Sequence, residues 1–202
     1  HKVVRQNHVG DWGTQFGMLI TYLLEQYPAL QDSTDTIEID DLEQFYRQAK
    51  QRFDEDERFA DTARQAVVSL QAHDPASVAI WQAIVKESRR HYQPIYDFLN
   101  VGLTEANERG ESFYNDLLAP VVLDLKDKGL AEASEGAICV FPEGFKNKEG
   151  CPMAFIVQKS DGGFLYATTD CAALKYRAER LKADRMVYVT DSRQKLHFEM
   201  LF

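Results

Sequence analysis

The sequence predicts a mixed α/β fold, a parallel sheet with a helical insertion and a small β-rich insertion. Three observations predict it. A short strand-like run leads through a glycine-rich junction, residues 7–17, into an amphipathic helix. Apolar residues then recur at helical spacing over about 41–97, and β-type runs dominate 130–165. Strands separated by helices favour a parallel sheet that binds its ligands at the carboxyl ends of the strands.

The opening unit is expected to run strand, loop, helix. Val3 and Val4 begin the strand, and apolar residues at positions 16–24 form one face of the helix. The three glycines of the junction are spaced three and four apart, so the dinucleotide fingerprint is absent. Two interpretations stay open for this junction, a phosphate-binding loop and tight packing of a helix against a strand. Residues 31–40 read as a loop or as the approach to a helix.

The helical insertion is predicted from periodicity and from one cap. Helical spacing covers positions 42–53 and 59–70, and Asp74-Pro75 is typical of a helix start. The helix that starts there is expected to end near Gln93-Pro94. A strand is predicted around Phe98 to Leu103.

The second half is expected to alternate between helices and strands. Its expected elements, in order, are a helix over 115–128 stopped by Gly129, strands over 137–141 and 154–157, a hairpin turn over 160–163, a returning strand over 164–166, a helix over 168–182 and a final strand over 186–189. The predicted domains are residues 1–129, which contain the helical insertion, the β-rich insertion 130–165, and a return to the core over 166–202.

Composition narrows the class of protein. The net charge of −9 argues against a large autonomous nucleic-acid surface. The three cysteines are separated by 12 and 20 residues, which fits neither a disulfide framework nor a metal-ligand pattern. A reducing compartment, hence the cytoplasm, is expected. No apolar run approaches the ~20 residues that span a bilayer, so no membrane partner is expected.

Three polar residues follow the predicted strand ends of the last part of the chain. Tyr166 closes one strand, Asp170 lies in the first turn of the following helix, and Gln194 follows the final strand. A carboxylate with an aromatic neighbour suits a guanidinium group, which is flat, charged and rich in N–H donors. An aspartate in a first turn more often complements the helix dipole, so both interpretations stay open on the residues alone.

Four blocks of the sequence resemble the arginyl-tRNA synthetases, a family of class I aminoacyl-tRNA synthetases. They occur in the family's order, and they are Asn7 to Ile20, residues 110–114 (GESFY), residues 161–170 (DGGFLYATTD) and residues 191–194 (DSRQ). The resemblance implies a partial Rossmann-like sheet of the class I catalytic core. The implied function is arginine–tRNA ligation, with arginine, ATP and Mg²⁺, and tRNA as partners in the full-length context.

The resemblance also implies roles for particular residues. Those expected to line the arginine pocket are Tyr166, Asp170 and Gln194. Those expected as a wall beside it are Asn7, Asp11 and Gln15. His197 is expected on the nucleotide side, and no protein-bound metal site is read from the sequence.

The chain departs from the family at its two ends. The ATP signature that class I synthetases carry upstream and the later lysine-bearing loop are missing, so the chain resembles an internal fragment and is expected to be inactive alone. Truncated sheet edges are expected to favour self-association. Two alternatives stay open: another class I synthetase or nucleotidyl transferase, and a non-enzymatic α/β module that binds a partner protein.

Overall fold

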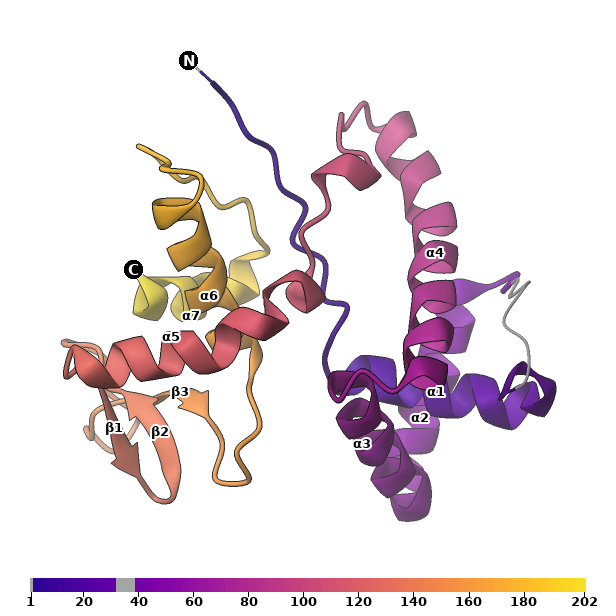
Figure 1. Cartoon of the computed structure of the whole chain (residues 1–202), viewed down its shortest axis with the longest axis horizontal. Helices are drawn as coiled ribbons and strands as arrows, with labels where there is room; N and C mark the ends of the chain where they lie inside the picture. Colours follow the sequence, from indigo (N-terminus) through magenta and orange to yellow (C-terminus); the bar gives the residue numbers. More distant parts are fainter. Residues whose placement is uncertain (1, 32–38) are drawn as a thin grey trace. The chain divides into compact units, whose positions relative to one another are not determined.

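The computed structural model describes residues 2–31 and 39–202, in two compact units, His1–Ser112 and Phe113–Phe202 (Figure 1). The part of the predicted loop that falls on residues 32–38 lies outside the described residues. The predicted domain boundaries after residues 129 and 165 stay predictions.

The first unit is a helical bundle. Its elements are α1 (Thr14–Gln26), the 3-10 turn η1 (Pro28–Gln31), α2 (Leu42–Glu55), α3 (Glu57–Gln71), α4 (Pro75–Phe98) and the 3-10 turn η2 (Glu105–Asn107). Aspartates start the last three helices: Asp41 accepts the Gln44 N–H at 2.8 Å, Asp56 the N–H groups of Arg58 and Phe59, and Asp74 the Ser77 N–H. The predicted helices over 42–53 and 59–70 and the Asp74-Pro75 start are therefore confirmed.

Helix α1 forms the centre of the first hydrophobic core. It packs chiefly on α3 and also contacts α2 and α4. The fully buried side chains of this core come from all four helices: Leu19, Ile20, Leu23, Ala49, Ala63, Leu70 and Ile84. Because the apolar face of α1 is covered by neighbours from three helices, the glycine-rich junction at its start is anchored to a rigid bundle.

Helix α4 does not end at Gln93-Pro94, and the strand predicted around Phe98 to Leu103 is wrong. Pro94 lies inside the helix, which continues to Phe98 because the next turn restores the bonding, with the Leu99 N–H on the Ile95 carbonyl at 3.0 Å. The Gln93 side chain also holds the following loop by donating to the Leu103 carbonyl at 3.1 Å.

The first unit pairs two backbone segments, but it does so at Asn7 and not at Val3 and Val4, where the strand was expected to begin. Asn7 forms a parallel bridge with Glu108, in which the Asn7 N–H donates to Asn107 and the Arg109 N–H donates to Asn7. Val3 and Val4, expected to begin the strand, lie outside any ladder and are exposed.

The second unit combines a small sheet with helices. The 3-10 turn η3 (Glu111–Tyr114) leads into α5 (Asn115–Asp127), followed by β1 (Ala131–Ser134), β2 (Ala137–Val140), β3 (Phe155–Gln158), α6 (Tyr166–Glu179), η4 (Ser192–Gln194) and α7 (Lys195–Leu201). Figure 1 shows α5 and α6 beside the sheet, and both contribute to one core. That core includes Leu118, Val121, Val122, Phe155, Val157, Ala172 and Ala173.

The predicted mixed α/β class is confirmed, with a correction to the sheet. The three strands pair antiparallel in the order β1-β2-β3. A two-residue turn joins β1 to β2, with Glu135 at φ 49° and Gly136 at φ 82°, and such a tight connection allows only antiparallel pairing. The predicted strand over 186–189 joins no ladder among the described residues, and its Val189 is 94% exposed.

The turn over residues 160–163 forms, but no strand returns from it. The Lys159 N–H donates to the Gly163 carbonyl at 2.8 Å and closes the turn. The chain then enters α6 at Tyr166, two residues earlier than predicted. Thr168 explains the early start: its hydroxyl accepts from the Leu165 N–H and donates to the Val157 carbonyl at 2.5 Å, which ties the helix start to β3.

Candidate functional site

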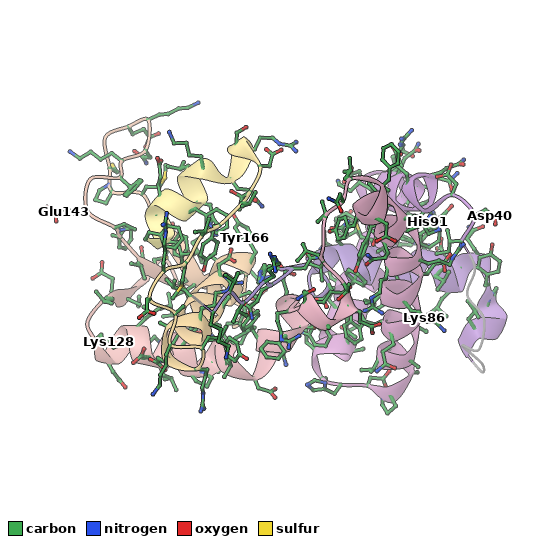
Figure 2. The ribbon with its side chains drawn as sticks, turned by 90° about the horizontal axis from the view of Figure 1, so that it is seen from above. Asp40, Lys86, His91, Lys128, Glu143 and Tyr166 are labelled. Carbon is green, nitrogen blue, oxygen red and sulfur yellow. The ribbon has the colours of Figure 1, made fainter. Side chains whose placement is uncertain are left out.

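The start of α6 carries two of the residues predicted to bind a ligand. Tyr166 is the first residue of the helix, and Asp170 lies one turn later, so the two share a face. Tyr166, labelled in Figure 2, is 62% exposed, whereas Asp170 is only 7% exposed. This pair presents an accessible aromatic ring beside a nearly buried carboxylate.

His197 of α7 joins this pair. Its Nε2 lies 2.7 Å from Oδ2 of Asp170, although 27 residues separate them in the sequence. The imidazole stacks on Phe155 with ring centres 5.4 Å apart, and it contacts Tyr166 at 4.9 Å and Phe198 at 5.0 Å. The structure therefore brings Tyr166, Asp170 and His197 into one cluster, and the predicted nucleotide-side role of His197 stays a prediction.

Gln194 lies at the end of η4, immediately before α7. Asp191 shapes this turn by accepting the Arg193 N–H at 2.9 Å, and the Gln194 N–H bonds the Asp191 carbonyl at the same distance. The Gln194 side chain is exposed and precedes His197 by three residues. Its side chain is thus accessible to a ligand.

Three predicted wall residues lie in the first unit. Asp11 is 7% exposed, and its carboxylate accepts both the N–H of Ser112 at 2.8 Å and the hydroxyl of Ser112 at 2.7 Å. Burial raises the pKa of the Asp11 carboxyl, and the two Ser112 hydrogen bonds oppose that rise. Asn7 donates to the Tyr96 hydroxyl at 3.3 Å, and Gln15 is exposed on α1.

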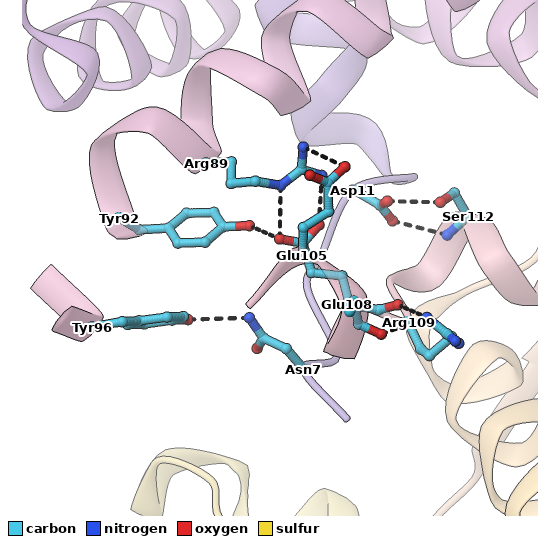
Figure 3. A network of polar contacts seen from close by, with 10 residues as sticks. Asn7, Asp11, Arg89, Tyr92, Tyr96, Glu105, Glu108, Arg109 and Ser112 are labelled. Carbon is cyan, nitrogen blue, oxygen red and sulfur yellow. Dashed lines mark hydrogen bonds and ion pairs between the residues drawn. The ribbon is translucent and has the colours of Figure 1, made fainter. Parts of the chain in front are cut away.

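A polar network next to these residues was missed in the sequence (Figure 3). Arg89 of α4 binds Glu108 through two hydrogen bonds, at 2.9 and 2.7 Å, and Tyr92 donates to the same carboxylate. Burial, followed by the bond to Glu108, raises the pKa of the Tyr92 hydroxyl. The spacing of Arg89, Tyr92 and Tyr96 on one helix face was the available signal, but it was lost because the helix was expected to end near residue 93.

The network fixes the segment that pairs with the start of the chain. Glu108 forms the parallel bridge with Asn7, so the ion pair to Arg89 attaches this pairing to α4. The Asp11 main-chain carbonyl is also bound, since the Trp81 indole N–H donates to it at 2.6 Å. The glycine-rich junction is therefore held at its start, Asn7, and at Asp11 by side chains of the first unit.

The second unit also contains an open hollow of about 810 Å³. Its walls come from residues 186–192, from α7 with the following Phe202, and from Phe145. The lining includes aromatic and polar side chains, among them Tyr188, Phe198, Asp191 and Lys195. Tyr166 and Asp170 are not among its lining residues. The hollow therefore adjoins the Asp170 cluster through Phe198, whose ring contacts His197.

Over residues 2–31 and 39–202, no group of three or more histidine, cysteine, aspartate or glutamate side chains is arranged to hold a metal ion. Within the same ranges no helix has the length and apolar character needed to cross a bilayer. The cysteines Cys139, Cys151 and Cys171 are not in disulfides.

Comparison with known families identifies the class of protein to which the chain belongs. Residues 1–202 match the family model described as tRNA synthetases class I (R), catalytic domain, and the chain belongs to this family. The resemblance that rested on four sequence blocks is therefore confirmed.

The chain is similar along its length to individual arginine–tRNA ligases. The chain is 58% identical over 200 residues to the arginine–tRNA ligase of Pseudomonas entomophila and 55% identical over 202 residues to that of Rippkaea orientalis. The two alignments include 99% and 100% of this chain, respectively, but only 34% of each relative. The chain therefore spans about a third of the relatives' length. The crystal structure of arginyl-tRNA synthetase from Plasmodium falciparum is similar, with a TM-score of 0.80 and 33% identity, over 98% of this chain and 32% of that one.

Proposed function

We propose that this chain supplies the amino-acid pocket of an arginine–tRNA ligase, with Tyr166, Asp170 and Gln194 as the arginine-binding residues. The observation that supports it most is the Asp170 carboxylate, nearly buried one helical turn from an exposed tyrosine, in a chain that matches the class I (R) family throughout. The relatives named above are arginine–tRNA ligases, and they give the proposal its substrate.

Each residue has a chemical role in this proposal. The carboxylate of Asp170 pairs with the guanidinium group of arginine, and the Tyr166 ring offers a face and a hydroxyl beside it. Gln194, exposed before α7, accepts from the α-ammonium group. A carboxylate partly removed from water binds a cation more strongly than one in bulk solvent, because screening is weaker there.

The reaction proceeds in two steps. The carboxylate of arginine attacks the α-phosphate of ATP, which gives arginyl-adenylate and releases pyrophosphate. A hydroxyl of the terminal adenosine of tRNA then attacks the arginyl carbonyl and displaces AMP. The residues proposed here bind and orient arginine, and no side chain of this chain acts as a nucleophile. Mg²⁺ stays an expectation from the family.

The residues of the first unit have a narrower proposed role. Asn7, Asp11 and Gln15 remain predicted wall residues beside the pocket. The bonds that Asp11 and Asn7 make within the first unit support a role in fixing the junction, since both side chains already have partners there. Gln15, exposed on α1, is the one of the three whose side chain is accessible to a ligand.

The proposal is tested in a chimaera. The matching segment of the Pseudomonas entomophila ligase is replaced by this chain, and pyrophosphate exchange is measured against arginine and against ATP. Asp170→Asn is expected to raise the KM for arginine about 100-fold, while the KM for ATP stays within about twofold, because one charge-assisted pair is lost at the arginine site. Asp116→Asn, an exposed aspartate on α5, is the matched control. An unchanged arginine KM removes Asp170 from the pocket, and activation of another amino acid instead of arginine overturns the function.

The isolated chain is expected to show no exchange. It spans about a third of the relatives' length. Arginine-dependent exchange by the 202-residue chain alone would contradict this expectation. If the chimaera is active and the isolated chain is not, the isolated chain lacks parts that the full-length ligase supplies. If both are inactive, the segment is misfolded.

A further inference from the structure

We propose that His197 is a positioning residue that holds the carboxylate of Asp170 in the orientation that pairs with a guanidinium group. The inference rests on the proposed function, since it concerns how the proposed arginine site selects its ligand. It assigns His197 a place beside the amino acid instead of the nucleotide.

The contact that carries the inference is short and sheltered. Nε2 of His197 lies 2.7 Å from Oδ2 of Asp170, and the two side chains are 14% and 10% exposed. A carboxylate oxygen accepts, so Nε2 carries the proton in this bond. Water competes little for such a contact, because little of either side chain is open to solvent.

The imidazole itself has little freedom. Phe155 of β3 stacks on one face at an interplanar angle of 21°, while Phe198 and Tyr166 meet the ring at 73° and 59°. A ring enclosed by three aromatic neighbours keeps its nitrogen in one direction. The direction of Nε2 then fixes the position of Oδ2, and with it the plane of the Asp170 carboxylate.

The plane of the carboxylate matters because a guanidinium group is flat. Two parallel N–H···O bonds form only when the carboxylate and the guanidinium group are nearly coplanar. Rotation of the carboxylate removes one of the two bonds and leaves a charge contact that any cation satisfies. Position therefore determines selectivity for a guanidinium group over an ammonium group or a neutral amide.

His197 also links the two segments that carry the pocket. It lies on α7, three residues after Gln194, while Asp170 and Tyr166 lie on α6. The contact at Asp170 thus fixes the start of α7 against the start of α6. The His197 side chain therefore fixes the position of the Asp170 carboxylate and of the segment that carries Gln194.

Two substitutions separate the hydrogen bond from the packing. His197→Phe keeps an aromatic ring between Phe155 and Phe198 but has no N–H, whereas His197→Gln keeps an N–H donor without the ring. Arginine and citrulline, whose neutral urea group replaces the guanidinium, are titrated calorimetrically into the 202-residue chain and into both variants. His197→Phe is expected to reduce the ratio of arginine to citrulline affinity about 10- to 100-fold, the value of a hydrogen bond to a charged group. His197→Gln is expected to restore most of this ratio.

The ratio of arginine to citrulline affinity separates a lost hydrogen bond from general damage to the fold, because general damage weakens the binding of both ligands equally. A ratio unchanged in His197→Phe overturns the positioning role and leaves the proposed function intact. Failure of the unsubstituted chain to prefer arginine at any concentration overturns both. A measurement without ligand checks the contact itself. In Asp170→Asn with an unchanged circular dichroism spectrum, the ¹⁵N resonances of the His197 imidazole are expected to shift, and unshifted resonances overturn the inference.

Discussion

The backbone of Gly17 lies directly against the main chain of Ala63. A methyl group placed on Gly17 would lie 2.2 Å from the Ala63 carbonyl oxygen and 2.5 Å from Cγ2 of Val67. Helices α1 and α3 therefore cross at a point where only a hydrogen atom fits. The last glycine of the junction at residues 7–17 serves packing, and the packing is of a helix against a helix.

Gly17→Ala is expected to destabilise the first unit by ~1–3 kcal/mol, because the helices must separate to admit the methyl group. Gly13→Ala is the matched control, since its methyl group would meet nothing closer than 3.9 Å. Unfolding in urea followed by circular dichroism gives both free energies. Equal effects of the two substitutions would show that the crossing adapts without cost.

Ser112→Ala is expected to destabilise the first unit more at neutral than at acidic pH. Burial raises the pKa of Asp11, so its folded pKa lies above the unfolded one and stability falls as the pH rises through it. The Ser112 hydroxyl opposes this loss by donating to the ionised form at 2.7 Å. Its removal is expected to cost ~1–3 kcal/mol at pH 7 and less near pH 4. Urea unfolding at both pH values, with Ser69→Ala as the control, measures the difference, and a cost independent of pH contradicts it.

Glu87→Gln is expected to destabilise the first unit at neutral pH and to have little effect on its stability in acid. Hydrogen bonds from Arg90 lower the pKa of the Glu87 carboxyl from 4.5 to about 2, and the carboxylate also accepts the Ile39 N–H at 2.9 Å. Because the folded pKa is depressed, the contribution is present above pH 4.5 and is lost as the pH falls through about 2. Arg90 is 58% exposed, so solvent screening limits the difference to ~1–2 kcal/mol.

Unfolding of the wild type and of Glu87→Gln between pH 7 and pH 2 tests this prediction. Glu43→Gln, in an exposed pair with Arg47, serves as the control and is expected to change stability by less than ~0.5 kcal/mol throughout. The two curves should converge in acid. Parallel curves would show that the carboxylate contributes nothing through its charge.

The chain is expected to self-associate through residues 186–189. Val187 and Val189 are 72% and 94% exposed in a segment that joins no ladder among the described residues, and an exposed run of β-branched apolar residues can pair with another chain. Val187→Thr with Val189→Thr is expected to weaken association about tenfold or more, measured by sedimentation over a range of concentrations. Val68→Thr, a single exposed valine on α3, is the control. An unchanged association constant would locate the contact elsewhere.

Local signals in the sequence were sufficient for most helices. Asp74-Pro75 and Gly129 marked helix ends because a cap depends on residues within one turn. Pro94 misled for the same reason: a proline predicts a helix end locally, and the tertiary setting of α4 outweighed it.

The contacts that build the candidate site were beyond local reasoning. Asp170 and His197 are 27 residues apart, and Asp11 and Ser112 are 101 residues apart. The residues around Asp170 and Asp11 in the sequence predicted two candidate carboxylates, but they did not predict which residue each carboxylate contacts. Likewise, the residues near Thr168 in the sequence did not predict that its hydroxyl donates to the Val157 carbonyl. That hydrogen bond fixes where α6 begins.

By itself the sequence determined the helical periodicity, the caps, the family and the residue types available to meet a guanidinium group. Only the tertiary structure decided that the sheet is antiparallel, that Gly17 is a helix crossing and that His197 binds Asp170. The physical reason is range: propensity and capping act within a turn of chain, whereas strand pairing, close packing and the setting of a buried carboxylate depend on residues brought together by folding.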